Sequence, residues 1–366
     1  MSPVPPTPRP RARDLGIAIG TLPVGPTNGI VDVPGVRVGQ VTVWHDEPGV
    51  ARTGVTAIVP DAVEALFDAP CAAGTAVLNG AGELTSSVAI AEWGVLETPI
   101  ALTSTMGVGR AYDGVVQAML DVHPGVGVLD VVIPCVGECD DSYLNDARTL
   151  SVTAQHTVDA IGAASAAAVA EGVVGAGAGM TCHGYKGGIG TSSRVVDGYT
   201  VGVLALTNFG DGSRFTVDGV PVGRLLPPPP EDDDVVDPPA GEGSCIVVVA
   251  TDAPLSHAQC ERVARRAGLG LARTGSIAGH SSGEIFCAFS TTFRVPRGET
   301  AAVVDRRELA TSRLNGVFGA TVDATEEAVL NSLFVADTVV GVRGHRAFGL
   351  PVERVLDLMR ARGRRA

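Results

Sequence analysis

The acidic, proline-rich stretch Asp237-Pro-Pro-Ala-Gly-Glu-Gly243 runs directly into the apolar stretch Ser244-Cys-Ile-Val-Val-Val-Ala-Thr-Asp-Ala-Pro254. The first has nothing to bury, whereas the β-branched residues of the second are typical of a buried strand. A hydroxyl residue, Ser244, stands at the boundary. If the chain cut itself before Ser244, that residue would gain a free amino group and carry a nucleophile and a base together. The stretch therefore predicts a self-cleaving enzyme.

Cys245 competes with Ser244 as the terminal nucleophile, because a thiol is the more reactive group. A cut before Cys245 would follow a serine, however, whereas a cut before Ser244 follows Gly243. Glycine lacks a Cβ and can adopt the strained backbone that cleavage favours. We therefore predict the cut at Gly243–Ser244, with Cys245 facing the opposite side of the strand.

The composition indicates a large apolar core and restricts the partners. Hydrophobic residues make up 45% of the 366 residues, and the net charge of −13 argues against binding to nucleic acid phosphates. Residues 1–243 carry 11 basic and 28 acidic groups, a balance of −17, whereas residues 244–366 carry 16 basic and 12 acidic groups, a balance of +4. Because opposite charges attract, we expect the two chains to stay associated after a cut.

Neither a membrane nor a metal is expected. No apolar run reaches the 18 residues of a membrane span, and the N-terminal residues lack the apolar segment of a secretory signal. Seven scattered cysteines, an odd number, favour a reducing cytoplasm over a disulfide framework. Cys135 and Cys139 are the only close pair, so no zinc site is predicted.

Local patterns predict a layered α+β fold. We expect residues 1–13 to form a disordered tail and residues 227–243, with four consecutive prolines, to form a solvated linker before the cut. Strands and helices gather in clusters rather than alternating, which argues against a doubly wound sheet. Strands are expected over 54–60, 74–79, 245–250 and 284–293, with short strand units broken by Pro-Gly over 30–44 and a strand pair over 195–208. Helices are expected over 85–93, 109–122, 153–171, 257–267 with Ser256 as N-cap, 325–342 and 352–362.

The glycine-rich stretch 179–193 invites a phosphate-loop interpretation that its spacing does not support. Tyr185 separates the second glycine from the lysine, and Gly187 stands where a serine or threonine should hold magnesium. Lys186 is nevertheless the only lysine in a chain that otherwise uses arginine, and the two side chains are not equivalent. Lys186 is therefore a candidate for a confined position that supports the site.

The stretch Gly279-His-Ser281-Ser-Gly283 matches the G-x-S-x-G nucleophile elbow of serine esterases. Asp337 and His345 follow in the order of an α/β-hydrolase triad. The elbow needs a strand before the serine and a helix after it. Here the preceding residues form a poor strand and Glu284-Ile-Phe-Cys-Ala-Phe a poor helix start, so a serine esterase using Ser281 remains only an alternative.

Several stretches resemble the self-processing L-aminopeptidase/D-esterase/D-amidase family, which includes the β-peptidyl aminopeptidases. The matching stretches follow one another over nearly the whole chain: 28–39, 77–85, 137–138 with 142–146, 184–191, and Gly243-Ser244 with 247–255. The resemblance implies one structural domain, a four-layer αββα sandwich related to the ornithine acetyltransferases. It also implies a precursor cut into an α chain (1–243) and a β chain (244–366), which assemble as a tetramer of heterodimers without a metal or organic cofactor.

The resemblance also assigns the site by matched position. It implies Ser244 as the nucleophile, Asn208 as the oxyanion-stabilising amide, and Ser282 with Glu284 as the pair that orients the nucleophile and its amine. It implies that Glu138 grips the free ammonium of the substrate.

One departure from the family pattern concerns the substrate. Some members have Glu-Thr-Tyr where this chain has Glu138-Cys139-Asp140, so a carboxylate replaces a tyrosine hydroxyl. The expected activity is hydrolysis of N-terminal aminoacyl (α-, β- or D-) amides, peptides or esters. Acyl transfer to an amine on the same scaffold, or an uncleaved binding protein, are the alternatives.

Overall fold

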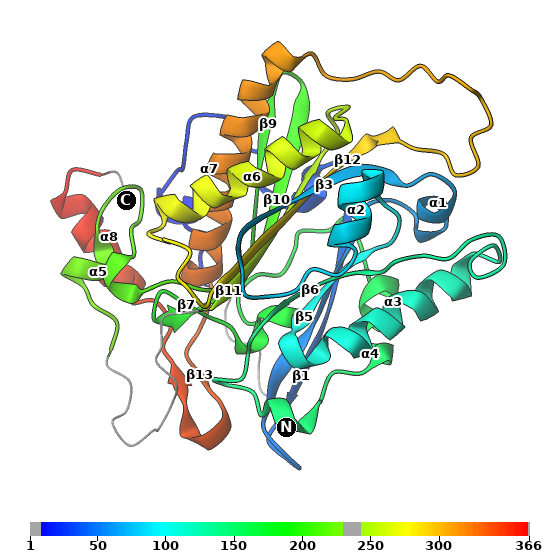
Figure 1. Ribbon diagram of the computed structural model, residues 1–366. Coiled ribbons are helices and arrows are strands. Elements are labelled where there is room, and N and C mark those ends of the chain that lie inside the picture. The colour runs from blue at the N-terminus through cyan, green and yellow to red at the C-terminus, as the bar shows by residue number, and fades with distance from the viewer. Residues whose placement is uncertain (1–8, 230–242, 365–366) are drawn as a thin grey trace.

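Two β-sheets pack face to face in the computed structural model, which describes residues 9–229 and 243–364 (Figure 1). The first sheet has the order β1-β2-β5-β6, and its strands are Arg37–His45, Ala51–Val59, Ile100–Ser104 and Cys135–Cys139. The second has the order β4-β3-β12-β11-β10-β9, with strands Val95–Leu96, Cys71–Gly80, Gly283–Arg294, Ser244–Thr251, Tyr199–Asn208 and Gly188–Val196. Neighbouring strands are antiparallel except for the pairs β5–β6 and β11–β12, which are parallel.

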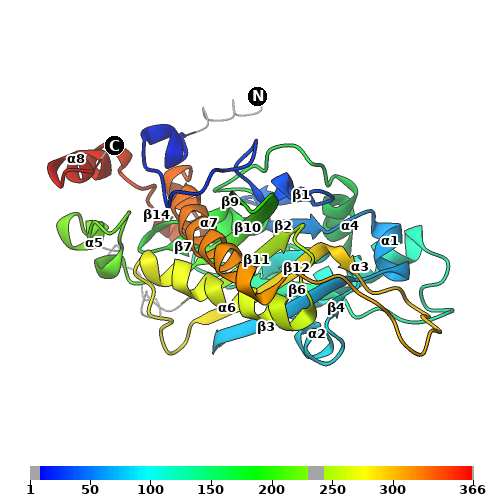
Figure 2. The same cartoon turned by 90° about the horizontal axis from the view of Figure 1, so that it is seen from above.

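Helices cover both outer faces of this pair of sheets. Figures 1 and 2 show α6 (His257–Arg273) and α7 (Leu314–Phe334) on the second sheet, and α3 (Val108–Val122) and α4 (Ala154–Gly162) on the first. The shorter elements are α1 (Val63–Asp68), α2 (Ser87–Trp93), α5 (Val222–Leu225), α8 (Val352–Ala361), and the hairpins β7 (Thr181–Cys182) with β8 (Tyr185–Lys186) and β13 (Val339–Val340) with β14 (Arg346–Ala347). None of the helices in the described ranges is both long enough and apolar enough to cross a membrane.

Strand β11 shows why the sheets lie in the middle of four layers. Every residue of β11 is buried, because both faces of the strand are covered. Cys245, Val247 and Val249 belong to the apolar core beneath α6 and α7, whereas Ile246 and Val248 belong to the core between the sheets. A third core lies between the first sheet and α3 and α4. These three cores confirm the expected αββα sandwich, with Cys245 facing the helices.

The Ala-rich helix predicted over 153–171 is wrong in its length. Helix α4 ends at Gly162, and the chain then forms a bridge in which Ser165 and Val38 exchange backbone hydrogen bonds of 3.0 and 3.1 Å. Pairing with β1 therefore overrides the helix propensity of the alanines that follow. The close fit depends on Gly39, where a Cβ would lie 2.0 Å from the Ala160 carbonyl oxygen.

The helix predicted over 325–342 is wrong at both ends. Helix α7 begins at Leu314, eleven residues earlier, and ends at Phe334, and Val339–Val340 form strand β13 instead. The first part of α7 contains glycines and β-branched residues, which are poor helix formers, so tertiary packing stabilises it. At Gly190 of β9 a Cβ would lie 1.8 Å from the Ala328 carbonyl oxygen, so this glycine lets α7 lie directly on the sheet.

Other predicted elements need smaller corrections. Residues 30–32 form a short 3₁₀ helix, and the strand that follows begins only at Arg37. The strand pair predicted over 195–208 covers β10 but only the last two residues of β9, which begins at Gly188; the hairpin turns at Asp197-Gly198. Helix α6 begins after Ser256 as predicted, but the Ser256 side chain makes no capping hydrogen bond.

The tail predicted over residues 1–13 is ordered at its end. The Arg9 guanidinium donates to the carbonyls of Ala336 and Leu350, and Arg11 forms an ion pair of 2.7 Å with Glu171. Arg13 pairs with the buried carboxylate of Glu327. Three arginines therefore fix this segment, where the composition indicated only a solvated chain. Residues 1–8, and 230–242 of the predicted linker, lie outside the described residues.

Candidate active site

Ser244 lies where the ends of three adjacent strands meet. It is the first residue of β11, and its register partners are Asn208 on β10 and Gly283 on β12. By the alternation of the strand its side chain faces the core between the sheets. There the hydroxyl lies beside the thiol of Cys139 on β6 of the other sheet. Ser244 is therefore a buried hydroxyl held between the two sheets.

Gly243 sits where no other residue fits without movement. A Cβ on Gly243 would lie 1.7 Å from the backbone oxygen of Asn208. The Gly243 carbonyl oxygen accepts a hydrogen bond of 3.0 Å from the Gly283 N–H, which is the last rung of the β11–β12 ladder. The carbonyl that precedes Ser244 is thus held by a fixed backbone donor.

The amide side chain of Asn208 is fixed at both ends. Its Oδ1 accepts a hydrogen bond of 2.9 Å from the Thr181 N–H, and its Nδ2 donates to the Asp140 carbonyl oxygen at 2.8 Å. The Thr181 contact defines which end of the amide carries the donor. A donor directed in this way, next to Ser244, can stabilise a negatively charged oxygen.

Ser282 and Glu284 form a hydrogen-bonded pair at the start of β12. The Ser282 hydroxyl donates to Glu284 Oε1 at 2.5 Å, and Glu284 Oε2 is buried without a hydrogen-bond partner. Glu284 lies opposite Cys245 in the register. Burial raises the pKa of the Glu284 carboxyl, and the hydrogen bond from Ser282 opposes that rise. The unpaired oxygen can accept a further donor.

Glu138 is the other buried carboxylate of the site. It lies on β6, and only 3% of its surface is exposed. Its Oε1 accepts from the Glu83 N–H at 2.9 Å, and its Oε2 accepts from the Thr105 hydroxyl. Burial raises the pKa of this carboxyl. Its neighbour in the chain, Cys139, contacts Ser244, so Glu138 belongs to the same end of the sheets.

Asp140 brings its backbone rather than its carboxylate to Asn208. The Asp140 carbonyl oxygen accepts from Asn208, whereas its carboxylate accepts the Ser142 N–H at 2.9 Å. The side chain is exposed. Where the sequence suggested a second carboxylate in place of a tyrosine hydroxyl, Asp140 contacts the site through its main-chain carbonyl.

The predicted supporting residue, Lys186, is fully buried on β8. Its ammonium donates to the carbonyl oxygens of Met180 at 2.6 Å and of Gly177 and Gly187 at 2.9 Å each. Burial lowers the pKa of Lys186 to about 7. Lys186 pairs in register with Thr181, whose N–H donates to Asn208, so one residue separates Lys186 from the candidate site.

Sequence reasoning did not single out Asn79 and Thr105. Asn79 Nδ2 donates to the carbonyls of Gly279 at 2.7 Å, His280 at 3.2 Å and Ser282, and so fixes the turn before β12. Asn79 stands in a stretch that resembles the family, but its function depends on a contact 200 residues away in the chain. No local signal reveals such a contact.

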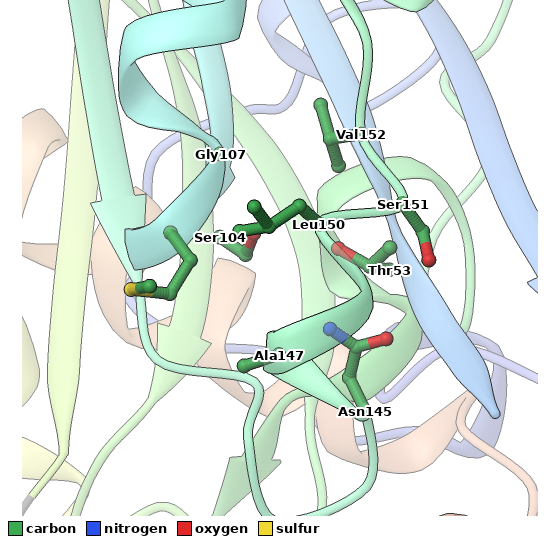
Figure 3. Close-up of a pocket in the computed structure, with 9 residues that line it drawn as sticks. Thr53, Ser104, Gly107, Asn145, Ala147, Leu150, Ser151 and Val152 are labelled. Atoms are coloured by element: carbon green, nitrogen blue, oxygen red, sulfur yellow. The ribbon is translucent and has the colours of Figure 1, made fainter. Parts of the chain in front are cut away.

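A small cavity lies beside the central strands β2 and β5 of the first sheet, next to Thr105 (Figure 3). Its volume is about 10 Å³, close to the roughly 10–15 Å³ that one water molecule needs. Ser104, in its lining, pairs in register with Cys139 and precedes Thr105. The cavity has no room for a substrate side chain in this arrangement.

The structure does not give Ser281 the setting of a nucleophile elbow. Ser281 lies in a turn that leads into strand β12, where the elbow requires a helix. Asp337 lies 3.9 Å from the Arg9 guanidinium, and His345 Nδ1 lies 2.6 Å from the Tyr143 carbonyl oxygen. The residues proposed for this triad have other partners.

The cysteines and acidic residues give no sign of a metal centre in the part of the chain that the structure describes. All seven cysteines are buried and free, including Cys135 and Cys139. Among residues 9–229 and 243–364, no cluster of three histidine, cysteine or acidic side chains has the arrangement of a metal site.

Comparison with known proteins agrees with the fold and shows the family. The model of peptidase family S58 matches residues 28–347. A β-peptidyl aminopeptidase BapA of Sphingosinicella microcystinivorans is 40% identical over 362 residues, which cover 93% of this chain and 90% of the relative.

Two solved structures share the architecture over 98% of this chain and 100% of their own. A β-aminopeptidase of a Burkholderia species is 41% identical with a TM-score of 0.89. The L-aminopeptidase D-Ala-esterase/amidase of Ochrobactrum anthropi is 36% identical with a TM-score of 0.90, and is described as a prototype for the serine aminopeptidases and a variant of the Ntn hydrolase fold. The αββα sandwich of this chain is that variant.

Proposed function

Because this chain is a serine aminopeptidase of peptidase family S58, we propose that it cuts itself at Gly243–Ser244 and then releases N-terminal residues from small peptides, aminoacyl amides and esters. The observation that carries the proposal is the pairing at the start of β11. There Ser244 lies between Asn208 and Gly283, and Gly283 holds the Gly243 carbonyl at 3.0 Å.

The cut begins with attack of Ser244 Oγ on the carbonyl carbon of Gly243. The Gly283 N–H faces the carbonyl oxygen, where negative charge develops. The C–N bond breaks, the nitrogen of Ser244 takes up a proton, and the acyl group passes to Oγ as an ester. Water then hydrolyses the ester and releases the α chain (1–243) with a new carboxylate and the β chain (244–366) with a new amine.

The new amine supplies the base for the second reaction. An α-amino group ordinarily has a pKa of about 7.7–8.0, so a useful fraction is neutral near pH 7. It accepts the proton of the Ser244 hydroxyl as Oγ attacks the substrate. Ser282 and Glu284 orient the amine, since Glu284 keeps one buried oxygen without a partner.

Glu138 and Asn208 hold the substrate at two places, its free ammonium and the carbonyl of the bond to be cut. The buried carboxylate of Glu138 binds the free ammonium of the substrate, which restricts the enzyme to N-terminal residues. Asn208 Nδ2 leaves the Asp140 carbonyl and donates to the oxyanion. Losing one such donor costs roughly 2.7–4 kcal/mol in related chemistry.

We extend the proposal to β-aminoacyl and D-aminoacyl substrates. The names of the relatives, a β-peptidyl aminopeptidase and an L-aminopeptidase D-Ala-esterase/amidase, support this range. Hydrolysis of β-alanyl, D-alanyl and L-alanyl p-nitroanilides at equal concentration ranks the three classes. A rate with L-alanyl alone would limit the enzyme to α-peptides.

Intact mass and a denaturing gel test the cut. We expect two chains in place of the 37.2 kDa precursor, one of them with the mass of a chain that begins at Ser244. We expect Ser244→Ala to remain a single, uncut and inactive chain. Ser281→Ala is the matched control and should process normally. A wild-type protein that is active as one 37.2 kDa chain would overturn the proposal, and an inactive Ser281→Ala with an active Ser244→Ala would favour the esterase alternative.

We also propose that the two chains remain together and assemble as a tetramer of heterodimers. The opposite charge balances of the two chains support the association. Light scattering of the native protein, compared with the masses on the denaturing gel, tests both statements.

A further inference from the structure

We propose that Lys186 is a positioning residue that strengthens Asn208 as an oxyanion donor, by polarising the peptide group between Met180 and Thr181. This inference rests on the proposed role of Asn208. The ammonium of Lys186 acts through two amide groups in series, and we call Lys186, the Met180–Thr181 peptide group and the Asn208 amide the relay.

The Met180–Thr181 peptide group is bonded at both ends. Its carbonyl oxygen accepts from Lys186 Nζ at 2.6 Å, and its N–H donates to Asn208 Oδ1 at 2.9 Å. The cation pulls electron density toward the oxygen, so the N–H becomes a stronger donor. The peptide group therefore transmits the charge of Lys186 to Asn208.

The Asn208 amide repeats the same arrangement. Its Oδ1 accepts from Thr181, and its Nδ2 donates to the Asp140 carbonyl oxygen at 2.8 Å. Both amides point in one direction, so their polarisation adds. Their low-dielectric surroundings preserve the effect, since Lys186 is fully buried and only 7% of Asn208 is exposed.

The geometry suits a lysine and no other cation. Three carbonyl oxygens, those of Met180, Gly177 and Gly187, converge on one nitrogen and use all three of its hydrogens. A planar guanidinium does not satisfy three oxygens around one point. This explains why a chain with 27 basic residues contains its single lysine here.

The hairpin of β7 and β8 holds the relay in register. Thr181 lies opposite Lys186, and the Gly187 N–H also donates to the Met180 carbonyl oxygen at 3.1 Å. A lysine that merely stabilised this hairpin would leave the same contacts, so the test must separate stability from catalysis.

The first experiment is a double-mutant cycle of Lys186→Met and Asn208→Ala, read on the rate of self-cleavage and on kcat/KM of the cleaved fraction. We expect Lys186→Met to lower kcat/KM about tenfold through kcat, with KM within about twofold, and to have less than a twofold effect when Asn208 is already alanine. Equal losses in both backgrounds, or no loss in the wild-type background, would overturn the relay.

Tyr185→Phe is the matched control in the same hairpin. It removes a hydrogen bond of 3.2 Å from the Tyr185 hydroxyl to the Leu226 carbonyl, which is not one of the hydrogen bonds of the relay. We expect kcat/KM to stay within about twofold even if the unfolding temperature falls. An Asn208→Ala protein with full activity would instead sink the proposed role of Asn208, which distinguishes that failure from failure of the relay.

A second measurement needs no variant at Lys186. Because the chain has one lysine, labelling with [¹³Cε]-lysine gives one resonance. An aminoalkyl boronic acid forms a tetrahedral anion on a serine hydroxyl, which mimics the oxyanion. We expect this probe to shift the Lys186 resonance of the mature enzyme. A resonance that stays in place while the probe inhibits the enzyme would overturn the inference.

Discussion

At the scale of single residues, the site depends on a few atoms that cannot be replaced. Gly243 has no space for a Cβ, and Glu284 keeps one buried oxygen without a partner. Both features are unfavourable for stability alone, and such features are expected at positions that serve the reaction.

Gly243→Ala should stop or strongly slow the self-cleavage. Its Cβ would lie 1.7 Å from the Asn208 carbonyl oxygen, so the Gly243–Ser244 peptide bond would have to move away from the attacking Ser244 hydroxyl. A time course on a denaturing gel measures the accumulation of precursor. Gly319→Ala is the control, since a Cβ there meets nothing within 4 Å. Cleavage of Gly243→Ala at the wild-type rate would show that this backbone position does not matter.

His183 should make the protein less stable in mild acid. It is buried against the rings of Phe209 and Phe215, and burial lowers its pKa to about 4 from 6.5. Between these values the unfolded chain binds a proton that the folded chain does not, so stability falls as pH falls through this window. Relative to His183→Gln, this amounts to about 2 kcal/mol between pH 7 and pH 5.

Denaturant unfolding at both pH values measures this difference, with Ser244→Ala in both proteins so that each unfolds as one chain. The comparison with His183→Gln removes the contributions of other groups, such as Glu171, whose pKa is raised to about 7 by burial. An equal pH dependence in the two proteins would show that His183 does not resist protonation.

At the scale of elements, the start of β11 at Ser244 was predictable from the sequence, whereas other boundaries were not. It was predictable because the composition changes abruptly at Ser244. The end of α4 depends on a bridge to β1, and the packing of α7 on the sheet depends on Gly190 of β9, where a Cβ would meet the Ala328 carbonyl oxygen. Residue patterns report local preference, and these features are set by partners far away in the sequence.

The residues of the candidate site likewise fall into those that the sequence indicated and those that it did not. Residue patterns alone indicated Ser244 and Gly243, and the resemblance to a family indicated Asn208, Ser282, Glu284 and Glu138. Neither revealed Thr181 or Asn79, because their contacts cross from one strand or turn to another. Such contacts follow from strand order, which the sequence does not encode locally.

Asn79→Ala should impair catalysis by loosening an element rather than by removing a reacting group. The change frees the turn before β12 and leaves the Gly279 and Ser282 carbonyls without this donor, at a cost of roughly 1–3 kcal/mol in stability. Because Ser282 shifts with the turn, we expect kcat to fall about tenfold. Gln155→Ala, on the exposed face of α4, is the control. Unchanged kcat in a less stable Asn79→Ala protein would separate the turn from catalysis.

At the scale of the whole molecule, the second sheet is shared between the proposed chains. Strands β11 and β12 belong to residues 244–366, and they lie between β3 and β10 of residues 1–243. Two ladders of backbone pairing therefore cross from one chain to the other. The charge balances of −17 and +4 add a long-range attraction to these hydrogen bonds.

This shared sheet changes the order of the folding reaction. Before the cut, β11 and β12 reach their places within one molecule, so the refolding rate of Ser244→Ala should not depend on concentration. After the cut, the same ladders form between two molecules, and refolding of the mature enzyme should speed up with protein concentration. Stopped-flow refolding over a tenfold dilution measures this, and equal dependence in both proteins would contradict it. Self-cleavage would then be irreversible for folding as well: when the mature enzyme unfolds, its two chains also separate and must meet again before they can refold.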